Sequence, residues 1–441
     1  MSERAPCDCL VCAELIITQD EQRTLVSNGA VAVVEGKVLS LGHAAEMRER
    51  FDAQSVIDLG PALLMPGLVN AHCHAPMSLL RGVADDLPLM QWLEKYIWPM
   101  EADLTRELVA VGAELACAEM IRTGTTAFMD GYFHEDVLGD IAQRSGLRVV
   151  LGEGFFSFPS PFFPTAKDCW RAIEGLEQRF SKNSLVRSAV TPHAVYTVTP
   201  DALVESYDLA CQLDMPWQTH CAETPAETKS CLEKYGKRPI AVLESLGVLS
   251  SRVTLAHCVD VLPEEMALLA ERGVHVVHNP TSNFKLSSGA APVQSMIDAG
   301  VSLGLGTDGA ASNNQLNMFA DMRMAALVGK VQAHNAAAVK AQAVLDMATR
   351  GSARCLHWEG LGILAPGNPA DMIALDMSSP NLMPMHNPVS QIVYAVSGHE
   401  VVMNMVEGRI IYRNGKYKDI DIKALQERMD DVVGWVRERI S

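Results

Sequence analysis

Residues 63–74 read Leu63-Leu64-Met65-Pro66-Gly67-Leu68-Val69-Asn70-Ala71-His72-Cys73-His74, an apolar run that ends in two histidines. The run over residues 63–69 predicts a short buried strand. Because side chains at positions i and i+2 of a strand point to the same face, we expect His72 and His74 to lie side by side at the strand end. Two neighbouring imidazoles can hold one metal ion, although a lone His-x-His pair also occurs often in surface loops. A metal site therefore needs further ligands from elsewhere in the chain.

After His74 the sequence alternates between short apolar runs and longer amphipathic segments, such as residues 199–213 and 262–272. With the opening strand, the apolar runs predict eight strands. Eightfold alternation of strand and helix is typical of a (β/α)8 TIM barrel, an α/β fold. The seven later strands are predicted at residues 125–130, 147–151, 186–191, 216–220, 253–257, 274–278 and 301–308.

The two ends of the chain have a different pattern, with β-rich runs and turns but few helical segments. We expect them to form one small β-sandwich domain, with the barrel inserted between its two halves. This divides the chain into residues 1–62, a barrel over 63–363, and residues 364–441. The last part completes the β domain and adds a helix over 422–440, predicted to pack on its own domain, with a partner-binding helix as the alternative.

Composition limits the classes of function. The 441 residues carry a formal net charge of -17, which argues against binding to nucleic acid or to anionic membrane surfaces. The first residues contain no apolar signal core, and no apolar run is long enough to span a bilayer. Eleven cysteines scattered through apolar segments are typical of free thiols in a cytoplasmic protein. A small-molecule partner is the remaining expectation.

Three of those cysteines, Cys7, Cys9 and Cys12, lie close together near the start of the chain. They can be interpreted as a thiolate cluster or as small apolar side chains of a first strand. We favour the structural interpretation, because no second cysteine pair with zinc-finger spacing follows.

The carboxyl ends of the predicted barrel strands are rich in metal-binding and acid–base side chains. In a TIM barrel the active site lies at this end. One histidine there would be interpreted as a buried core residue, but histidine or aspartate at six of eight strand ends is improbable by chance. The residues are His72 and His74 on the first strand, His193 on the fourth, His220 followed by Glu223 on the fifth, His257 on the sixth, His278 on the seventh and Asp308 on the eighth.

The donor set points to one divalent metal ion. Three imidazoles and one carboxylate suit zinc or another late first-row metal, with water in the remaining position. No lysine ends the fourth strand, where a carbamylated lysine would bridge two metals, so one ion is the simpler prediction. A second candidate motif, His357-Trp358-Glu359, is interpreted as coincidence because no Pro-Cys-x-x-Cys accompanies it. The predicted ligands are His72, His74, His220 and Asp308.

The order of these motifs resembles the amidohydrolase superfamily, and within it the 5-methylthioadenosine/S-adenosylhomocysteine deaminases. The resemblance covers nearly the whole chain, including the split β domain. Triazine chlorohydrolases and other aminohydrolases share much of the pattern. The motifs are residues 66–74, His220-Cys221-Ala222-Glu223, Leu255-Ala256-His257-Cys258, His278-Asn279-Pro280 and Gly306-Thr307-Asp308-Gly309.

The resemblance implies a role for each residue of the site. It implies a metal on His72, His74, His220 and Asp308, with Glu223 as proton shuttle and His257 as partner of the water. The chemistry agrees, since such a metal lowers the pKa of its water to about 7 and a carboxylate can move the protons. Without the resemblance, Glu223 would be interpreted as a first-turn carboxylate favoured by the helix dipole.

Three further residues match positions that this family uses near a nucleoside. The resemblance implies that Trp92 packs on the sugar or base, that Glu101 accepts hydrogen bonds from two ribose hydroxyls, and that His193 donates to a purine nitrogen. Glu223 would also contact the base. Without the resemblance, Trp92 would be interpreted as a core residue and Glu101 as an exposed helix residue.

The predicted function is zinc-dependent hydrolytic deamination of the 6-amino group of adenine nucleosides, which gives the inosine analogue and ammonia. The alternatives are deamination of guanine, dechlorination of a triazine, and a metal-free structural protein on the same scaffold. The last is disfavoured because every expected ligand is present. We also expect a homo-oligomer, a dimer or a tetramer.

The loop after the third strand bears on the 5′ group of the nucleoside. Family members that accept S-adenosylhomocysteine well are expected to carry arginines there, whereas residues 151–163 contain no arginine, an acidic Glu153 and five phenylalanines. These rings either pack the loop or form an apolar pocket. The pocket predicts 5′-methylthioadenosine as the best substrate, adenosine next and S-adenosylhomocysteine last.

Overall fold

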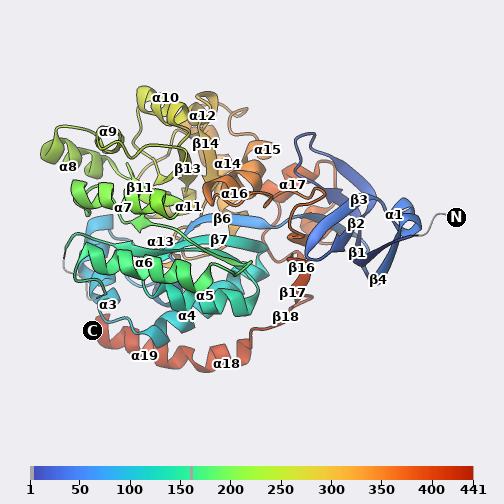
Figure 1. The fold of residues 1–441 in the computed structure, drawn as a ribbon. Helices are drawn as coiled ribbons and strands as arrows, with labels where there is room; N and C mark the ends of the chain where they lie inside the picture. Colours follow the sequence, from blue (N-terminus) through green and yellow to red (C-terminus); the bar gives the residue numbers. More distant parts are fainter. Residues whose placement is uncertain (1–3, 159–161, 441) are drawn as a thin grey trace.

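A closed barrel of parallel strands forms the centre of the protein (Figure 1). The computed structural model describes residues 4–158 and 162–440, and within them the strands form eight barrel positions, the fourth shared by two short strands. This confirms the predicted TIM barrel. The strands are β6 (Leu68–Cys73), β7 (Thr125–Tyr132), β8 (Arg148–Phe155), β9 (Val186–Ser188) with β10 (Thr191–Pro192), β11 (Trp217–Cys221), β12 (Val253–His257), β13 (His275–His278) and β14 (Ser302–Leu305).

The barrel consists of one five-stranded sheet, β6 to β10, and one four-stranded sheet, β11 to β14, which join at two places. Bridges Val190–Trp217 and Ala194–His220 link the first sheet to β11. On the other side, the Asp308 amide donates to the His72 carbonyl at 3.0 Å, which joins β14 to β6. This closing bond brings the first and last predicted metal ligands together.

The helices of the barrel begin and end at residues suited to those positions. Thr165 and Asp168 form a reciprocal capping box at the start of α6, and Gly146 ends α5 in the left-handed conformation at φ 83°. The main helices are α4 (Arg106–Arg122), α5 (Glu135–Ser145), α6 (Ala166–Phe180), α7 (Pro200–Gln212), α8 (Pro225–Tyr235), α9 (Pro239–Ser245), α10 (Pro263–Arg272), α11 (Pro280–Lys285), α12 (Val293–Asp298), α14 (Met318–Gln332), α15 (Ala341–Asp346), α16 (Ser352–Cys355) and α17 (Pro388–Tyr394).

Both ends of the chain contribute to a nine-stranded sheet beside the barrel. Strand β5 pairs in parallel with β1 from the N-terminal part and antiparallel with β15 from the C-terminal part. The strands are β1 (Ala5–Ile17), β2 (Leu25–Val34), β3 (Lys37–His43), β4 (Phe51–Asp58), β5 (Ala62–Pro66), β15 (Met372–Asp376), β16 (Val401–Val406), β17 (Arg409–Arg413) and β18 (Lys416–Tyr417). The small β domain is thus assembled from segments on either side of the barrel sequence.

The apolar run at residues 63–69 is not one strand, as the sequence predicted, but parts of two. Strand β5 belongs to the nine-stranded sheet and β6 to the barrel, with Gly67 between them. A Cβ atom at Gly67 would lie 2.1 Å from the side chain of Thr126, so only glycine fits this crossing. Because both strands are fully buried, the hydrophobic pattern could not separate them. We therefore propose Gly67 as the start of the barrel domain.

The C-terminal segment forms two helices, α18 (Ile422–Glu427) and α19 (Met429–Ile440), where one was expected. They run along the barrel rather than the small β domain (Figure 1). Val432 and Val436 of α19 join the same apolar cluster as Trp92 and Ile97, and Arg439 pairs with Asp103 at 3.0 Å. The chain end therefore supports the helical segment that carries Trp92.

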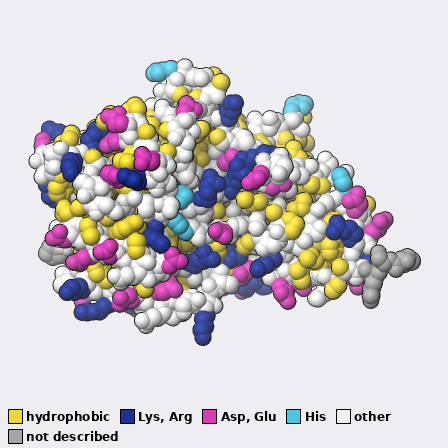
Figure 2. Space-filling view, turned by 45° about the horizontal axis from the view of Figure 1, so that its top comes forward, with side chains coloured by type: hydrophobic (Ala, Val, Ile, Leu, Met, Phe, Trp, Pro, Cys, Tyr) yellow, Lys and Arg dark blue, Asp and Glu magenta, His cyan; other side chains and the backbone are white. Residues whose placement is uncertain are grey.

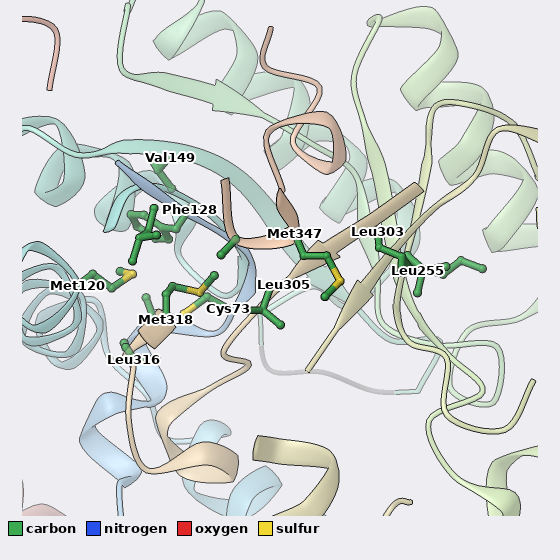
Figure 3. Close-up of a cluster of buried hydrophobic side chains, with 14 of the residues drawn as sticks. Cys73, Met120, Phe128, Val149, Leu255, Leu303, Leu305, Leu316, Met318 and Met347 are labelled. Atoms are coloured by element: carbon green, nitrogen blue, oxygen red, sulfur yellow. The ribbon is translucent and has the colours of Figure 1, made fainter. Parts of the chain in front are cut away.

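The core lies in two layers around the barrel wall. Between the strands and the outer helices, Met120, Phe128 and Val149 pack on one side and Leu255 and Leu303 on another (Figure 3). Inside the barrel a separate apolar cluster, which includes Trp358 and Leu361, fills the space at the strands' amino ends. The barrel interior is thus packed with side chains at the amino ends of the strands, which leaves the carboxyl ends as the place for a binding site.

The surface mixes charges of both signs, as Figure 2 shows on one face. None of the described helices is long and apolar enough to cross a membrane. Cys7, Cys9 and Cys12 are buried in β1, and the possible metal-ligand groups of the described residues lie elsewhere. Their structural interpretation is the one that fits this strand.

Candidate active site

A pocket opens at the carboxyl ends of the barrel strands. It is lined by all of the predicted metal-binding, catalytic and substrate-binding residues. They lie at the ends of β6, β10, β11, β12 and β14 or in the residues that follow these strands, and in the helical segment before α4. These residues are His72, His74, Trp92, Glu101, His193, His220, Glu223, His257 and Asp308.

Three histidines present the same nitrogen to the pocket because their other nitrogen is held from behind. In each ring Nδ1 contacts an oxygen that can only accept a hydrogen bond, so the proton is on Nδ1 and the lone pair is on Nε2. The contacts are His72 to Gln218 Oε1 at 2.8 Å, His74 to the Gly131 carbonyl at 2.7 Å, and His220 to the His193 carbonyl at 2.7 Å.

The Nε2 atoms converge with the Asp308 carboxylate. Asp308 Oδ1 lies 3.6 Å from Nε2 of His72 and 3.3 Å from Nε2 of His74. The Nε2 atoms of His74 and His220 are 3.3 Å apart, and that of His72 is buried with no hydrogen-bond partner in the described part of the chain. Burial, with His72 nearby, lowers the pKa of His74 to about 4, which keeps its ring neutral. The described residues form two overlapping groups of potential metal ligands that share His72: one is His72, His74 and Asp308, and the other is His72, His220 and His257. Imidazoles with a carboxylate at such distances fit a divalent metal such as zinc.

The backbone turns sharply where the strands deliver these side chains. Ala222, His257 and Asp308 have φ values of 51°, 73° and 63°, in the left-handed region that residues with a Cβ rarely adopt. Such strain is typical of functional sites, where the surrounding structure holds a side chain in place. Here it directs groups from three different strands toward one pocket.

Glu223 lies between the end of β11 and the start of α8. Its own amide donates to Glu227 Oε2 at 2.7 Å, and Thr224 caps the helix, so Glu227 is the first-turn carboxylate rather than Glu223. Burial raises the pKa of Glu223 to about 8, and the nearby charge of Asp308 adds to this effect. Glu223 therefore faces the pocket with a proton that it can donate.

His257 and His278 differ although both end barrel strands. The His257 ring lies 5.6 Å from that of His72 and 5.4 Å from that of His220, and its Nδ1 is 2.8 Å from Asn283 Oδ1. His278 is buried and does not line the pocket, and neither of its ring nitrogens has a hydrogen-bond partner among the described residues. Of the strand-end histidines, His278 is thus the one that the structure separates from the others.

The predicted nucleoside contacts come from one helical segment and from the fourth barrel position. Trp92 ends α2 (Leu89–Trp92) and Glu101 ends α3 (Trp98–Glu101), with a π-helical turn between them. Burial raises the pKa of Glu101 to about 7, and the Tyr132 hydroxyl partly offsets this. The His193 ring lies 4.5 Å from that of Phe156.

The phenylalanines after β8 divide between pocket and core. Phe156 lines the pocket, and Phe158 lies 4.9 Å from it and 5.5 Å from Trp98, ring to ring. Phe162 stacks on Phe133, another lining residue, whereas Phe155 lies 5.0 Å from Trp170 and Phe163 packs on the barrel core. No lysine or arginine lines the pocket in the described part of the chain. Residues 159–161 lie outside that part and read Pro-Ser-Pro.

Sequence reasoning missed several residues that hold the site. Gln218 lies two positions before His220 on the same strand face, which is a signal that the period-two pattern could have given. Ser312 and Ser282 donate to Asp308 Oδ2, and Asn283 contacts His257. These contacts join separate segments of the chain, so the pattern of a single sequence does not reveal them.

Comparisons with known proteins agree with this geometry. The sequence profile of the Amidohydrolase family matches residues 63–411. The 5-methylthioadenosine/S-adenosylhomocysteine deaminase of Nitratidesulfovibrio vulgaris is 49% identical over 435 residues, 99% of each chain.

Solved structures share the whole fold. The crystal structure of an adenosine deaminase from Xanthomonas campestris with bound zinc has a TM-score of 0.96 and 38% identity, and the match covers 99% of this chain and 100% of that one. An atrazine chlorohydrolase from Arthrobacter aurescens complexed with zinc has a TM-score of 0.89 at 24% identity over 96% of this chain and 100% of its own, so it supports the fold alone. The chain belongs to the amidohydrolase family, within which it groups with the 5-methylthioadenosine/S-adenosylhomocysteine deaminases.

Proposed function

We propose that this protein is a zinc-dependent aminohydrolase that deaminates adenine nucleosides at the 6-position. Nucleoside and water give the inosine analogue and ammonia. The observation that carries the proposal is that two overlapping groups of potential metal ligands, His72 with His74 and Asp308 and His72 with His220 and His257, lie in one pocket with the buried Glu223. Relatives named as deaminases of 5-methylthioadenosine and S-adenosylhomocysteine, and a zinc-containing adenosine deaminase, support it.

His72, His74, His220 and Asp308 would hold the metal. When bound, zinc acts as a Lewis acid and makes water nucleophilic at neutral pH. Asp308 would accept a proton from the attacking water, since its Oδ1 lies 3.3 Å from Nε2 of His74 while Oδ2 accepts from two serine hydroxyls. Glu223 donates its proton to the ring nitrogen beside the amino-bearing carbon, which allows that carbon to accept the nucleophile. His257, whose ring lies near those of His72 and His220, would orient that water.

The wall opposite the metal site would bind the nucleoside. Glu101 as a carboxylate accepts hydrogen bonds from two ribose hydroxyls, and Trp92 packs on the sugar or base. His193 would contact a purine nitrogen. All three lie in the lining of the same pocket as Glu223, which supports one continuous site for base and sugar.

One experiment separates this function from the alternatives. Ammonia release is measured with adenosine, methylthioadenosine, S-adenosylhomocysteine, guanine and a chlorotriazine. The proposal expects release from the adenine nucleosides and none from guanine. Chloride release from the triazine, or ammonia from guanine alone, would replace it with one of the other hydrolase functions. No turnover together with no bound zinc in the purified protein would favour the structural scaffold.

Metal removal tests the ligand set. Asp308→Ala removes both a ligand and the proton acceptor, so we expect activity at background level and reduced zinc in metal analysis. Chelation of the wild-type enzyme should abolish activity, and added zinc should restore it. Wild-type turnover by the Asp308→Ala variant would mean that the eighth strand was assigned wrongly.

Two broader properties stay proposals. A homo-oligomer, dimer or tetramer, has some support from Leu327 and Val331, which lie one helical turn apart on α14 and are 46% and 73% exposed. Light scattering after size-exclusion chromatography tests it. A cytoplasmic location is supported by eleven cysteines that form no disulfide, ten of them buried.

A further inference from the structure

The segment that follows β13 contacts residues of the site, although the histidine at the end of β13 does not line the pocket. His278, at that strand end, stays outside the pocket, while the short helix α11 follows directly. Its consecutive residues Ser282 and Asn283 are buried, at 0% and 1% exposed. Ser282 contacts Asp308 from the eighth strand, and Asn283 contacts His257 from the sixth.

We propose that Asn283 is a positioning residue that fixes His257 as the Nδ1-protonated tautomer, and that Ser282 beside it orients Asp308. This rests on the proposed function, because His257 and Asp308 are its acid–base groups. The two positioning residues are consecutive in sequence, so one short helix sets the geometry of both groups.

The argument for Asn283 starts from hydrogen-bond chemistry. Its Oδ1 lies 2.8 Å from Nδ1 of His257, and a carbonyl oxygen only accepts hydrogen bonds. The proton of a neutral His257 must then be on Nδ1, which leaves the Nε2 lone pair for the pocket. His257 makes no other side-chain hydrogen bond within residues 4–158 and 162–440. Asn283 is thus the group that decides which nitrogen of His257 can accept a proton.

The position of Asn283 is itself fixed. Its amide donates to the Asn279 carbonyl at 3.0 Å, which forms the first turn of α11. In the same turn, the backbone amide of Thr281 donates to Asp321 of α14 at 3.3 Å. Among the described residues Asn283 Nδ2 has no hydrogen-bond partner, and the contact with His257 is the hydrogen bond that orients the side chain.

Ser282 has a parallel role that it shares with another residue. Its hydroxyl donates to Asp308 Oδ2 at 2.5 Å, and Ser312 donates to the same oxygen at 2.8 Å. The Gly309 amide donates to Oδ1 at 2.8 Å. Donors on both oxygens of a carboxylate fix its rotation. Because Ser312 duplicates Ser282, loss of Ser282 should have a smaller effect than loss of Asn283.

Two substitutions at one position separate a tautomer effect from general damage. Asn283→Leu keeps the approximate size but removes the acceptor, and Asn283→Asp keeps an acceptor at the same place. We expect Asn283→Leu to lower kcat about 100-fold with KM nearly unchanged, and Asn283→Asp to stay within about 10-fold of wild type. Phe284→Ala, an exposed residue of the same helix at 47% exposure, is the matched control and should leave kcat unchanged.

A second readout needs no turnover. Nitrogen-15 NMR of the histidine rings in the metal-free protein reports which nitrogen of His257 is protonated, with the signal assigned by its loss in His257→Gln. We expect protonated Nδ1 in the wild type, Asn283→Asp and Ser282→Ala, and a shift toward protonated Nε2 in Asn283→Leu. Protonated Nε2 in the wild type would overturn the proposal even if Asn283→Leu does not fold. An equal loss of kcat in Asn283→Leu and Asn283→Asp would also overturn the proposal. An inactive enzyme with the expected tautomer would instead refute the proposed function alone.

Discussion

At the scale of single residues, Glu223 combines burial with a supporting carboxylate behind it. It is 6% exposed, and Glu227 binds the amides of Ala222 and Glu223, which fixes the turn that carries the acid. Glutamine has the same shape but cannot transfer a proton. We expect Glu223→Gln to keep the fold and the zinc and to lose about 10² to 10⁴ in kcat, the usual contribution of a positioned general acid. Single-turnover rates with adenosine measure this, and an unchanged rate would exclude the shuttle role.

Glu101 should control the binding of the sugar and its pH dependence. Its pKa of about 7 means that the carboxylate, which we propose accepts hydrogen bonds from both ribose hydroxyls, is lost as the pH falls below that value. We expect KM for adenosine to rise below about pH 7 while kcat changes less. Glu101→Ala should raise KM at all pH values, remove this dependence and leave the zinc content alone. Equal wild-type activity on free adenine and adenosine would argue against a ribose contact.

The raised pKa of Glu101 also affects the stability of the folded protein. The folded pKa of Glu101 lies above its ordinary value of 4.5, so the folded state binds the proton more tightly than the unfolded chain. The stability that this group contributes is complete below about pH 4.5 and is lost as the pH rises through about 7. Glu101→Gln should therefore gain Tm relative to wild type at alkaline pH only.

At the scale of elements, the loops after β7 and β8 together with α3 form an aromatic wall. Trp98, Phe133 and Phe156 line the pocket, and Phe158 packs on this group. A methylthio group gains about 0.8 kcal/mol per buried CH₂-sized unit there. The carboxylate and ammonium of S-adenosylhomocysteine would lose water without an ionic partner, which costs roughly a few kcal/mol.

We therefore expect kcat/KM to be highest for methylthioadenosine, close behind for adenosine and lowest for S-adenosylhomocysteine. Parallel measurements under one set of conditions test the order. Phe158→Arg should raise kcat/KM for S-adenosylhomocysteine relative to that for methylthioadenosine, because the arginine supplies a cation for the carboxylate. If S-adenosylhomocysteine is the best wild-type substrate, the wall does not contact the 5′ group.

The strand ends could be predicted from the sequence, whereas the support behind them could not. His72, His220 and Asp308 are recognisable because each follows an apolar run and the fold places the ends of such runs together. Asn283 and Ser312 follow no such rule, since their contacts arise only when two loops meet. The junction at Gly67 was hidden for another reason, because two fully buried strands of different sheets form one continuous apolar run.

At the scale of the whole molecule, one buried ion pair joins the barrel to the small β domain. Arg148 at the start of β8 and Asp371 before β15 are 2% and 3% exposed, with Arg148 Nε 2.6 Å from Asp371 Oδ2 and Nη2 3.2 Å from Oδ1. Trp358 lies under the guanidinium at 5.2 Å. The pair therefore lies where both domains meet the base of the barrel.

Arg148→Ala should destabilise the protein by about 3–5 kcal/mol, because Asp371 would remain buried without its cation. Thermal denaturation followed by circular dichroism measures it. Arg179→Ala, which breaks the exposed pairs with Asp136 and Asp140, is the matched control and should cost no more than about 1 kcal/mol. Similar Tm values for the two variants would contradict the claim that the buried Arg148–Asp371 pair stabilises the contact between the domains.

The pairing of β5 with both β1 and β15 also determines the order of events during translation. Strands β1 to β5 leave the ribosome first, but one edge of β5 has no partner until β15 is synthesised, after the entire barrel. An unpaired, wholly apolar strand edge invites association with other nascent chains. The barrel can form meanwhile, since its strands are contiguous in sequence. Chaperone demand and insoluble product in the cell should therefore depend on how quickly the ribosome reaches residue 376.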